Sequence, residues 1–224
     1  MKQQLNVTDT LSAYIAGNDA ARLPEAVVEK TKIHILDTIG AIVSGSLLKP
    51  GRLIIDFVRT QGGPEEATVA ASNFRTSVVL AALANGTMAH ADETDDAHFP
   101  TVSHPGSVAV SAALPVAERE HRSGSALIAA VVLGYDVMCR ASKALDRQWM
   151  HDRGLHAGSM GGNFAAAAVA SRLLGLHAEQ IRYALALAGS QASGLSTWRQ
   201  EKEHIDKALS RAGLPARNGV TAAL

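Results

Sequence analysis

Residues 163–174, NFAAAAVASRLL, constrain the fold more than any other stretch of this sequence. Alanine has the highest intrinsic helix propensity, and small side chains allow two helix axes to approach closely. Hydrophobic residues make up 47% of the chain but aromatic residues only 4%, so the core must be built from small aliphatic side chains. These features predict an all-α fold, a multi-helix globular domain with closely packed helices, rather than a β-sandwich.

The apolar pattern predicts a series of helices separated by turns. The predicted helices cover residues 7–17, 23–46, 52–61, 76–91, 107–120, 125–145, 163–174, 178–192 and 216–224, with a helical turn at 204–209. The helix over 23–46 is apolar on all sides, which predicts that it is buried. Residues 67–71 form either a short strand or an extended connector, whereas 147–162 and 194–203 are predicted to be polar loops.

The charge balance and the N-terminal sequence exclude several classes of protein. Lys plus Arg and Asp plus Glu each total 21, so the formal net charge is zero, whereas a nucleic-acid binder needs a basic surplus. The single cysteine, Cys139, excludes an intrachain disulfide framework and fits a reducing compartment. The N-terminus has no secretory apolar region, and no uncharged apolar run has a convincing membrane-span length. We therefore expect a cytoplasmic protein with no nucleic-acid and no membrane partner.

The stretch AHADETDDAHFPTVSHPG, residues 89–106, concentrates acidic and imidazole side chains. They are His90, Asp92, Glu93, Asp95, Asp96, His98 and His104. Four carboxylates within five positions repel one another, so the cluster costs stability unless something uses it. A solvated acidic loop, a metal site and an acid/base site all fit these residue types. The spacing matches none of the compact metal motifs, such as HExxH.

Two further stretches could carry chemistry. Residues 150–162, MHDRGLHAGSMGG, place His156 before a predicted helix start, where backbone N–H groups bind anions; a glycine-rich turn with a surface histidine is the alternative. The cations that could pair with substrate carboxylates are Arg140, Lys143, Lys207, Arg211 and Arg217. Their alternative role is the charged face of an amphipathic helix.

Taken together, these motifs resemble the MmgE/PrpD family, which includes 2-methylcitrate dehydratase, cis-aconitate decarboxylase and iminodisuccinate epimerase. The stretches that match in the family's order are NGTMAHADETDDAH (85–98), SHPGSVAVSAALPVAE (103–118), GYDVMCR (134–140), GLHAGSMGGNFAAAAVASRLLGL (154–176), ALALAGSQASGL (184–195) and ARNGVTAAL (216–224). The resemblance implies a large helical domain followed by a smaller α/β lid domain. We therefore expect 1–224 to be a single helical domain, cut before the lid, in agreement with an apolar helical pattern that continues to Leu224.

The resemblance also implies a reaction: a proton is removed next to a carboxylate of a small di- or tricarboxylate, followed by loss of water, loss of CO₂ or reprotonation. It implies no metal and no other cofactor, and a homodimer. Activity like that of 2-methylcitrate dehydratase is expected first, with activity like that of cis-aconitate decarboxylase or iminodisuccinate epimerase as the alternatives. The residues it implicates are His104 and His156 as acid and base, Glu93 at the family's acidic position, Asp96 orienting a neighbour, and Lys207, His98 and Arg140 in substrate binding.

Two departures from the family pattern bear on the substrate. Ala97 stands where the family usually has Thr, and Lys207 is followed by ALSRAGLPARNG, where many members have a His before a glycine. Two other functions remain open from the residues alone. One is a metal-dependent hydrolase that uses Asp95, Asp96, His98 and the pair His151–Asp152. The other is a helical domain with no activity, which serves only for interaction.

Overall fold

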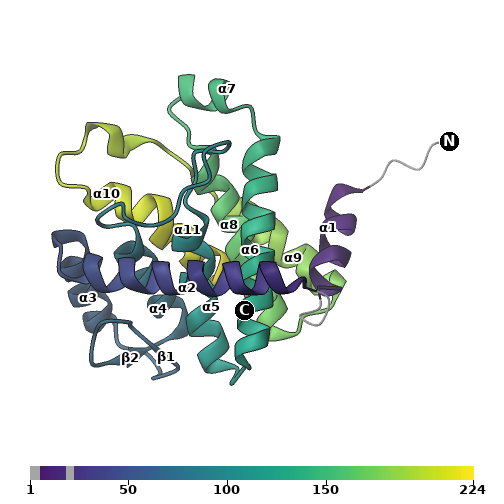
Figure 1. Cartoon of the computed structure of the whole chain (residues 1–224). Helices are drawn as coiled ribbons and strands as arrows, with labels where there is room; N and C mark the ends of the chain where they lie inside the picture. Colours follow the sequence, from purple (N-terminus) through teal and green to yellow (C-terminus); the bar gives the residue numbers. More distant parts are fainter. Residues whose placement is uncertain (1–5, 19–22) are drawn as a thin grey trace.

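The computed structural model describes residues 6–18 and 23–224, and helices dominate it (Figure 1). The helices are α1 (Val7–Ala16), α2 (Glu25–Ser46), α3 (Lys49–Gln61), α4 (Val78–Ala89), α5 (Pro105–Arg119), α6 (Gly124–Ala144), α7 (Arg147–Asp152), α8 (Ala157–Leu174), α9 (Ala178–Gln191), α10 (Ile205–Ala208) and α11 (Leu214–Ala223). A 3-10 turn covers Thr197–Gln200, and a π-helical turn, Leu209–Gly213, joins α10 to α11. The strands β1 (Ala67–Thr68) and β2 (Arg75–Thr76) pair antiparallel, with Ala67 opposite Thr76. The prediction of an all-α fold is confirmed.

Helix α8 lies at the centre of the packing. Its residues 165–170 are completely buried, and α6, α11, α5 and α9 pack around it. The close approach of α6 depends on Gly134, where an added Cβ would come 2.7 Å from both Ala109 Cβ and Val169 Cγ2. Small side chains therefore set the spacing of the core helices, as the alanine-rich sequence predicts.

Helix α2 lies across the outside of α4, α5 and α6 (Figure 1). The prediction that this helix is buried is wrong, because Ile33, Leu36 and Val43 are between 51% and 71% exposed. The buried side of α2 consists mostly of small residues, including Thr38, Ala41 and Gly45. The helix thus has more apolar residues than its one packed face needs.

Two predicted loops contain helix. Residues 147–162 hold α7 and the first turns of α8, which begins at Ala157 rather than at position 163. The cap is His156, whose Nδ1 accepts a hydrogen bond from the backbone N–H of Ser159 at 3.0 Å. In 194–203, the 3-10 turn interrupts the predicted loop. Helix α3 also begins three positions earlier than predicted, with Pro50 in its first turn.

Helix α6 is an apolar helix of membrane-span length, although it carries the charged residues Asp136, Arg140 and Lys143. By length and composition alone, it is long and apolar enough to cross a membrane, a test that core helices of globular proteins also meet. In this fold it packs along α8 and α5, and Leu133, Val137 and Met138 are buried.

Candidate functional site

The loop between α4 and α5 carries the central residues of the candidate site. It begins at His90, which follows the last residue of α4, and ends at His104, which precedes Pro105 of α5. The backbone N–H of His98 donates to the carbonyl of Ser103 at 2.8 Å and closes the loop on itself. Glu93 and Val102 adopt positive φ angles of 57° and 51°, which non-glycine residues rarely take. This folding places the side chains of His90, Asp95 and His104 together.

Asp95 lies between the two imidazole rings. His90 Nδ1 is 3.0 Å from Asp95 Oδ2 and 3.1 Å from Oδ1. His104 Nδ1 is 3.5 Å from Asp95 Oδ1, longer than an ordinary hydrogen bond, as is common before substrate is bound. The two rings are 4.6 Å apart, and the side chains of His90 and Asp95 are fully buried. The carboxylate can therefore orient both imidazoles, with His90 fully buried and His104 21% exposed.

Burial controls the charge of this cluster. It raises the pKa of Asp95 to about 6, although the charges of His104 and Arg211 favour the ionised form. Burial lowers the pKa of His90 well below its usual value, with the charges of Arg211 and Lys207 adding to the effect. Burial also lowers the pKa of His104, against the opposing charge of Asp95. Near neutral pH the cluster is thus two neutral imidazoles beside a carboxylate, which suits a base that accepts a proton from carbon.

His156 has both ring nitrogens engaged. Nδ1 accepts from the N–H of Ser159, so the proton of the neutral ring lies on Nε2, which donates to the carbonyl of Val102 at 3.2 Å. Burial, together with the charge of Arg211, lowers the pKa of His156 to about 3. In this arrangement His156 caps α8 and holds the loop that precedes His104. The acid/base role expected for it stays a prediction.

Lys207 and Glu93 meet at the edge of the cluster. The Lys207 ammonium forms an ion pair with Glu93, and His204 Nε2 contacts the same carboxylate. Burial, together with the charge of Arg211, lowers the pKa of Lys207 to about 8. Glu93 and His204 both have positive φ, at 57° and 61°. The two residues that hold the lysine are thus themselves fixed in unusual backbone conformations.

Trp198 is a residue of the site that the sequence analysis missed. Lys207 Nζ and Arg211 Cζ each lie 5.2 Å from the centre of its indole ring, and the ring of His156 lies 6.2 Å away at a near-perpendicular angle. Trp198 belongs to the 3-10 turn between α9 and α10, far from the loop motif in sequence. Because these contacts depend on tertiary packing, no local sequence signal identifies this tryptophan.

Asp96 faces away from Asp95, toward α2. Its Oδ1 accepts the backbone N–H of Gly106 at 2.9 Å, and its Oδ2 is 3.2 Å from His34 Nδ1. A Cβ at position 106 would come 2.7 Å from Asp96 Oδ1 and 2.6 Å from Thr38 Oγ1, so this close approach requires glycine. Asp96 therefore fastens the first turn of α5, directly after His104.

The two remaining predicted binding residues have other contacts. His98 Nδ1 is 2.7 Å from Thr101 Oγ1, within its own loop. Arg140 is exposed on α6, where its Nε donates to Asp136 Oδ1 at 2.7 Å. Arg140 lines an apolar pocket between α1, α6 and α8 and takes no part in the contacts of the cluster. The structure does not bring Arg140 together with His104.

A metal ion would find a different set of ligands from the one that the sequence suggested. Within residues 6–18 and 23–224, the group with suitable donor atoms within 4.8 Å of one another is His90, Asp95 and His104. It shares only Asp95 with the hydrolase hypothesis. The pair His151–Asp152 lies exposed on α7, with Nδ1 and Oδ1 3.5 Å apart.

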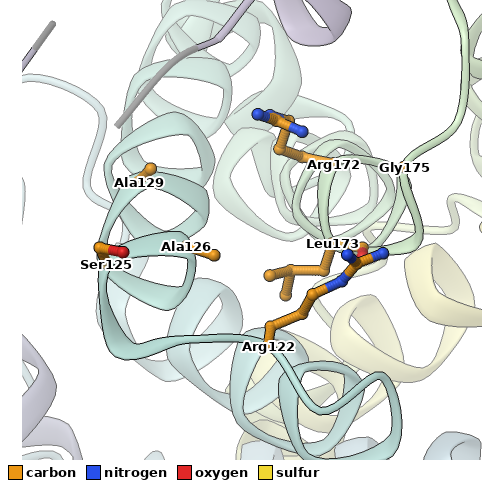
Figure 2. A pocket seen from close by; sticks show the side chains of 7 residues that line it. All are labelled: Arg122, Ser125, Ala126, Ala129, Arg172, Leu173 and Gly175. Atoms are coloured by element: carbon orange, nitrogen blue, oxygen red, sulfur yellow. The ribbon is translucent and has the colours of Figure 1, made fainter. Parts of the chain in front are cut away.

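Two polar cavities lie near arginine side chains. One, of about 290 Å³, is lined by residues that include Ser159, Thr197, Ser210 and Arg217, next to the π-helical turn. The other, of about 230 Å³, lies between Arg122 and Arg172, at the start of α6 and the end of α8 (Figure 2). In this second cavity both arginines use Nε to hold backbone carbonyls, those of Leu173 and Asn18. The two arginines thus hold the chain at the ends of α1 and α8. The lining of neither cavity includes His90, Asp95 or His104.

The fold and the cluster define a helical domain of the MmgE/PrpD type. Residues 9–224 match the family model described as the MmgE/PrpD N-terminal domain. The chain belongs to the MmgE/PrpD family, as the order of its motifs predicts.

Curated relatives are cis-aconitate decarboxylases or proteins like them. The chain is 31% identical over 229 residues to cis-aconitate decarboxylase-like protein oryM of Aspergillus oryzae, covering 98% of this chain and 46% of the relative. It is 28% identical over 207 residues to the cis-aconitate decarboxylase of Aspergillus terreus, covering 90% of this chain and 42% of the relative. It is 28% identical over 192 residues to the cis-aconitate decarboxylase of Homo sapiens, covering 84% of this chain and 40% of the relative. The chain therefore spans less than half the length of these relatives.

Proposed function

We propose that this chain provides the acid/base site of a lyase that acts on a small di- or tricarboxylate. The observation that carries the proposal is a neutral imidazole, His104, beside the buried carboxylate of Asp95, with the cations Lys207 and Arg211 nearby. The cations would bind substrate carboxylates through charge-assisted hydrogen bonds. Asp95 would hold the proton of His104 on Nδ1, leaving Nε2 to exchange a proton with the substrate.

This arrangement can serve either of two reactions. In decarboxylation of cis-aconitate, the bond to a carboxylate breaks, CO₂ leaves, and His104, after taking a proton from solvent, would deliver it to carbon. In dehydration of 2-methylcitrate, a base removes the proton next to a carboxylate, and the hydroxyl group leaves as water with a proton from an acid. The names of the curated relatives favour cis-aconitate as the first substrate to test, and the family resemblance makes 2-methylcitrate the second.

We further propose that the reaction needs no metal. Asp95 is hydrogen-bonded to His90, and the imidazole of His104 would carry the transferred proton without a metal. A metal at His90, Asp95 and His104 would instead consume the imidazole that the reaction needs.

The test is turnover by the full-length protein, with cis-aconitate, 2-methylcitrate and iminodisuccinate supplied separately, with and without EDTA. Proton NMR of the mixture identifies substrate and product directly. We expect one of these acids to be consumed at the same rate in both conditions. Consumption that EDTA abolishes and a divalent ion restores would contradict the metal-free proposal and point to the His90–Asp95–His104 group. No consumption of any acid would contradict the proposed lyase function.

A further inference from the structure

Arg211 is a buried cation without a counter-ion in the part of the chain that the structure describes. Its side chain is only 9% exposed, and no carboxylate oxygen of the described residues lies within 4.0 Å of it. Burying an unpaired charge is costly, so buried guanidinium groups normally contact an acidic partner. Asp95 is near enough for its charge to raise the pKa of Arg211, but burial still lowers that pKa to about 10. The missing partner is therefore expected to come from a bound molecule.

The backbone at Arg211 is unusual as well. Arg211 lies in the π-helical turn Leu209–Gly213, which packs on α4, the helix that leads to His90. Such turns are rare and occur frequently at functional sites. The same segment is the one that departs from the family pattern after Lys207. The turn thus gives this chain a buried arginine next to the cluster.

Most of the hydrogen-bonding capacity of Arg211 is unused. Its Nη2 donates to the carbonyl of Val102 at 3.3 Å, the carbonyl that also accepts from His156, which accounts for one of five N–H groups. Arg211 lies over the ring of Trp198, whose Nε1 is buried and has no hydrogen-bond partner among the described residues. Unpaired buried donors at one place indicate that oxygen atoms of a ligand bind there.

Lys207 and Arg211 contact the same indole ring, that of Trp198. Two positive charges this close repel each other, and the charge of Arg211 helps to lower the pKa of Lys207. Lys207 already has Glu93 as its counter-ion, so Arg211 is the cation of this pair that needs the negative group of a bound molecule.

We propose that Arg211 binds one carboxylate of the substrate with two parallel N–H···O bonds. Arg211 then selects substrates that place a carboxylate at this position, and it is a specificity-determining residue. This inference rests on the proposed function and names a binding group that the family motifs do not include. An arginine forms such a two-bond contact and a lysine does not.

The test is steady-state kinetics of the full-length protein with cis-aconitate, for the wild type, Arg211→Gln, Arg211→Lys and Arg199→Gln. Arg199 is the matched control, because its guanidinium lies 5.6 Å from the same Trp198 ring but is exposed. In Arg211→Gln we expect KM to rise roughly 10- to 100-fold, because the charge-assisted hydrogen bonds to the substrate are lost. We expect kcat to change much less. In Arg211→Lys we expect a smaller rise, and in Arg199→Gln a KM within about twofold of the wild type.

Thermal melting establishes that each variant is folded. A folded Arg211→Gln variant with the KM of Arg199→Gln would overturn the inference. If Arg211→Gln does not fold, the KM of Arg211→Lys becomes the test. An unchanged KM in Arg211→Lys would overturn the proposed two-bond contact. Failure of the wild type to bind or convert any polycarboxylate would instead overturn the proposed function itself.

Discussion

Asp95 shows how position rather than residue type creates a functional side chain. Its carboxylate is buried between His90 and His104, so its pKa rises to about 6 and its charge controls both rings. His104 and Lys207 could be proposed from the sequence because they lie on motifs of the family. Asp95 could not be separated from Asp92 and Asp96, because the sequence shows only an acidic run and the fold alone decides which carboxylate is buried.

Replacing Asp95 with Asn should remove the pH dependence that Asp95 imposes. In the wild type Asp95 is ionised above its pKa of about 6, so we expect activity to fall as the pH drops through that value. Burial lowers the pKa of His104, so protonation of this ring is disfavoured over the same range. We expect kcat of Asp95→Asn to be reduced at pH 7 by at least about tenfold. The measurement is kcat against pH for both proteins.

One result would contradict this role of Asp95. If Asp95→Asn kept the same fall in activity near pH 6, another group would cause it, and the role given to Asp95 would be wrong.

Small residues at the helix crossings allow the helices of this domain to pack closely. Replacing glycine with alanine should therefore change the free energy of unfolding in opposite directions at a crossing and at an open position. At Gly134 an added methyl group would meet Ala109 and Val169, so overpacking outweighs the gain in helix propensity. At Gly40 nothing lies within 4 Å of an added Cβ. We expect Gly134→Ala to lower the free energy of unfolding by about 1–3 kcal/mol. Gly40→Ala should raise it by about 0.5–1 kcal/mol.

Urea denaturation of the two variants and the wild type measures both changes. A Gly134→Ala variant at least as stable as the wild type would contradict the close approach of α6 to α5 and α8.

The positions of helices could be predicted from the sequence where the apolar periodicity was strong. Their boundaries could not be predicted where glycine fits both a loop and a close contact between helices. The glycines of 158–162 suggested a loop, yet they lie inside α8, where small residues allow close contact; a Cβ at Gly161 would come 2.3 Å from Ser142 Oγ. Helix α2 shows the opposite failure, since its apolar content predicted burial that its position on the outside does not provide. Contacts of this kind depend on tertiary packing, which local patterns do not contain.

At the scale of the whole molecule, the site is assembled from two distant parts of the chain. The loop between α4 and α5 supplies the imidazoles and Asp95, and the segment from the 3-10 turn to the π-helical turn supplies Trp198, Lys207 and Arg211. The family resemblance predicted the loop and Lys207, whereas the meeting of Trp198 with Arg211 follows only from the fold. The homodimer stays a prediction, and the exposed apolar face of α2 is a surface where it could form.

The most direct test of this account is turnover of cis-aconitate by full-length protein that carries His104→Gln. The matched control is His151→Gln, because His151 is exposed on α7 and outside the cluster. The account predicts that His104→Gln stays folded and loses at least about 100-fold in kcat, the usual contribution of a general acid or base, while the control is unaffected. Wild-type turnover by a folded His104→Gln variant would contradict the assignment of His104 as the acid/base residue.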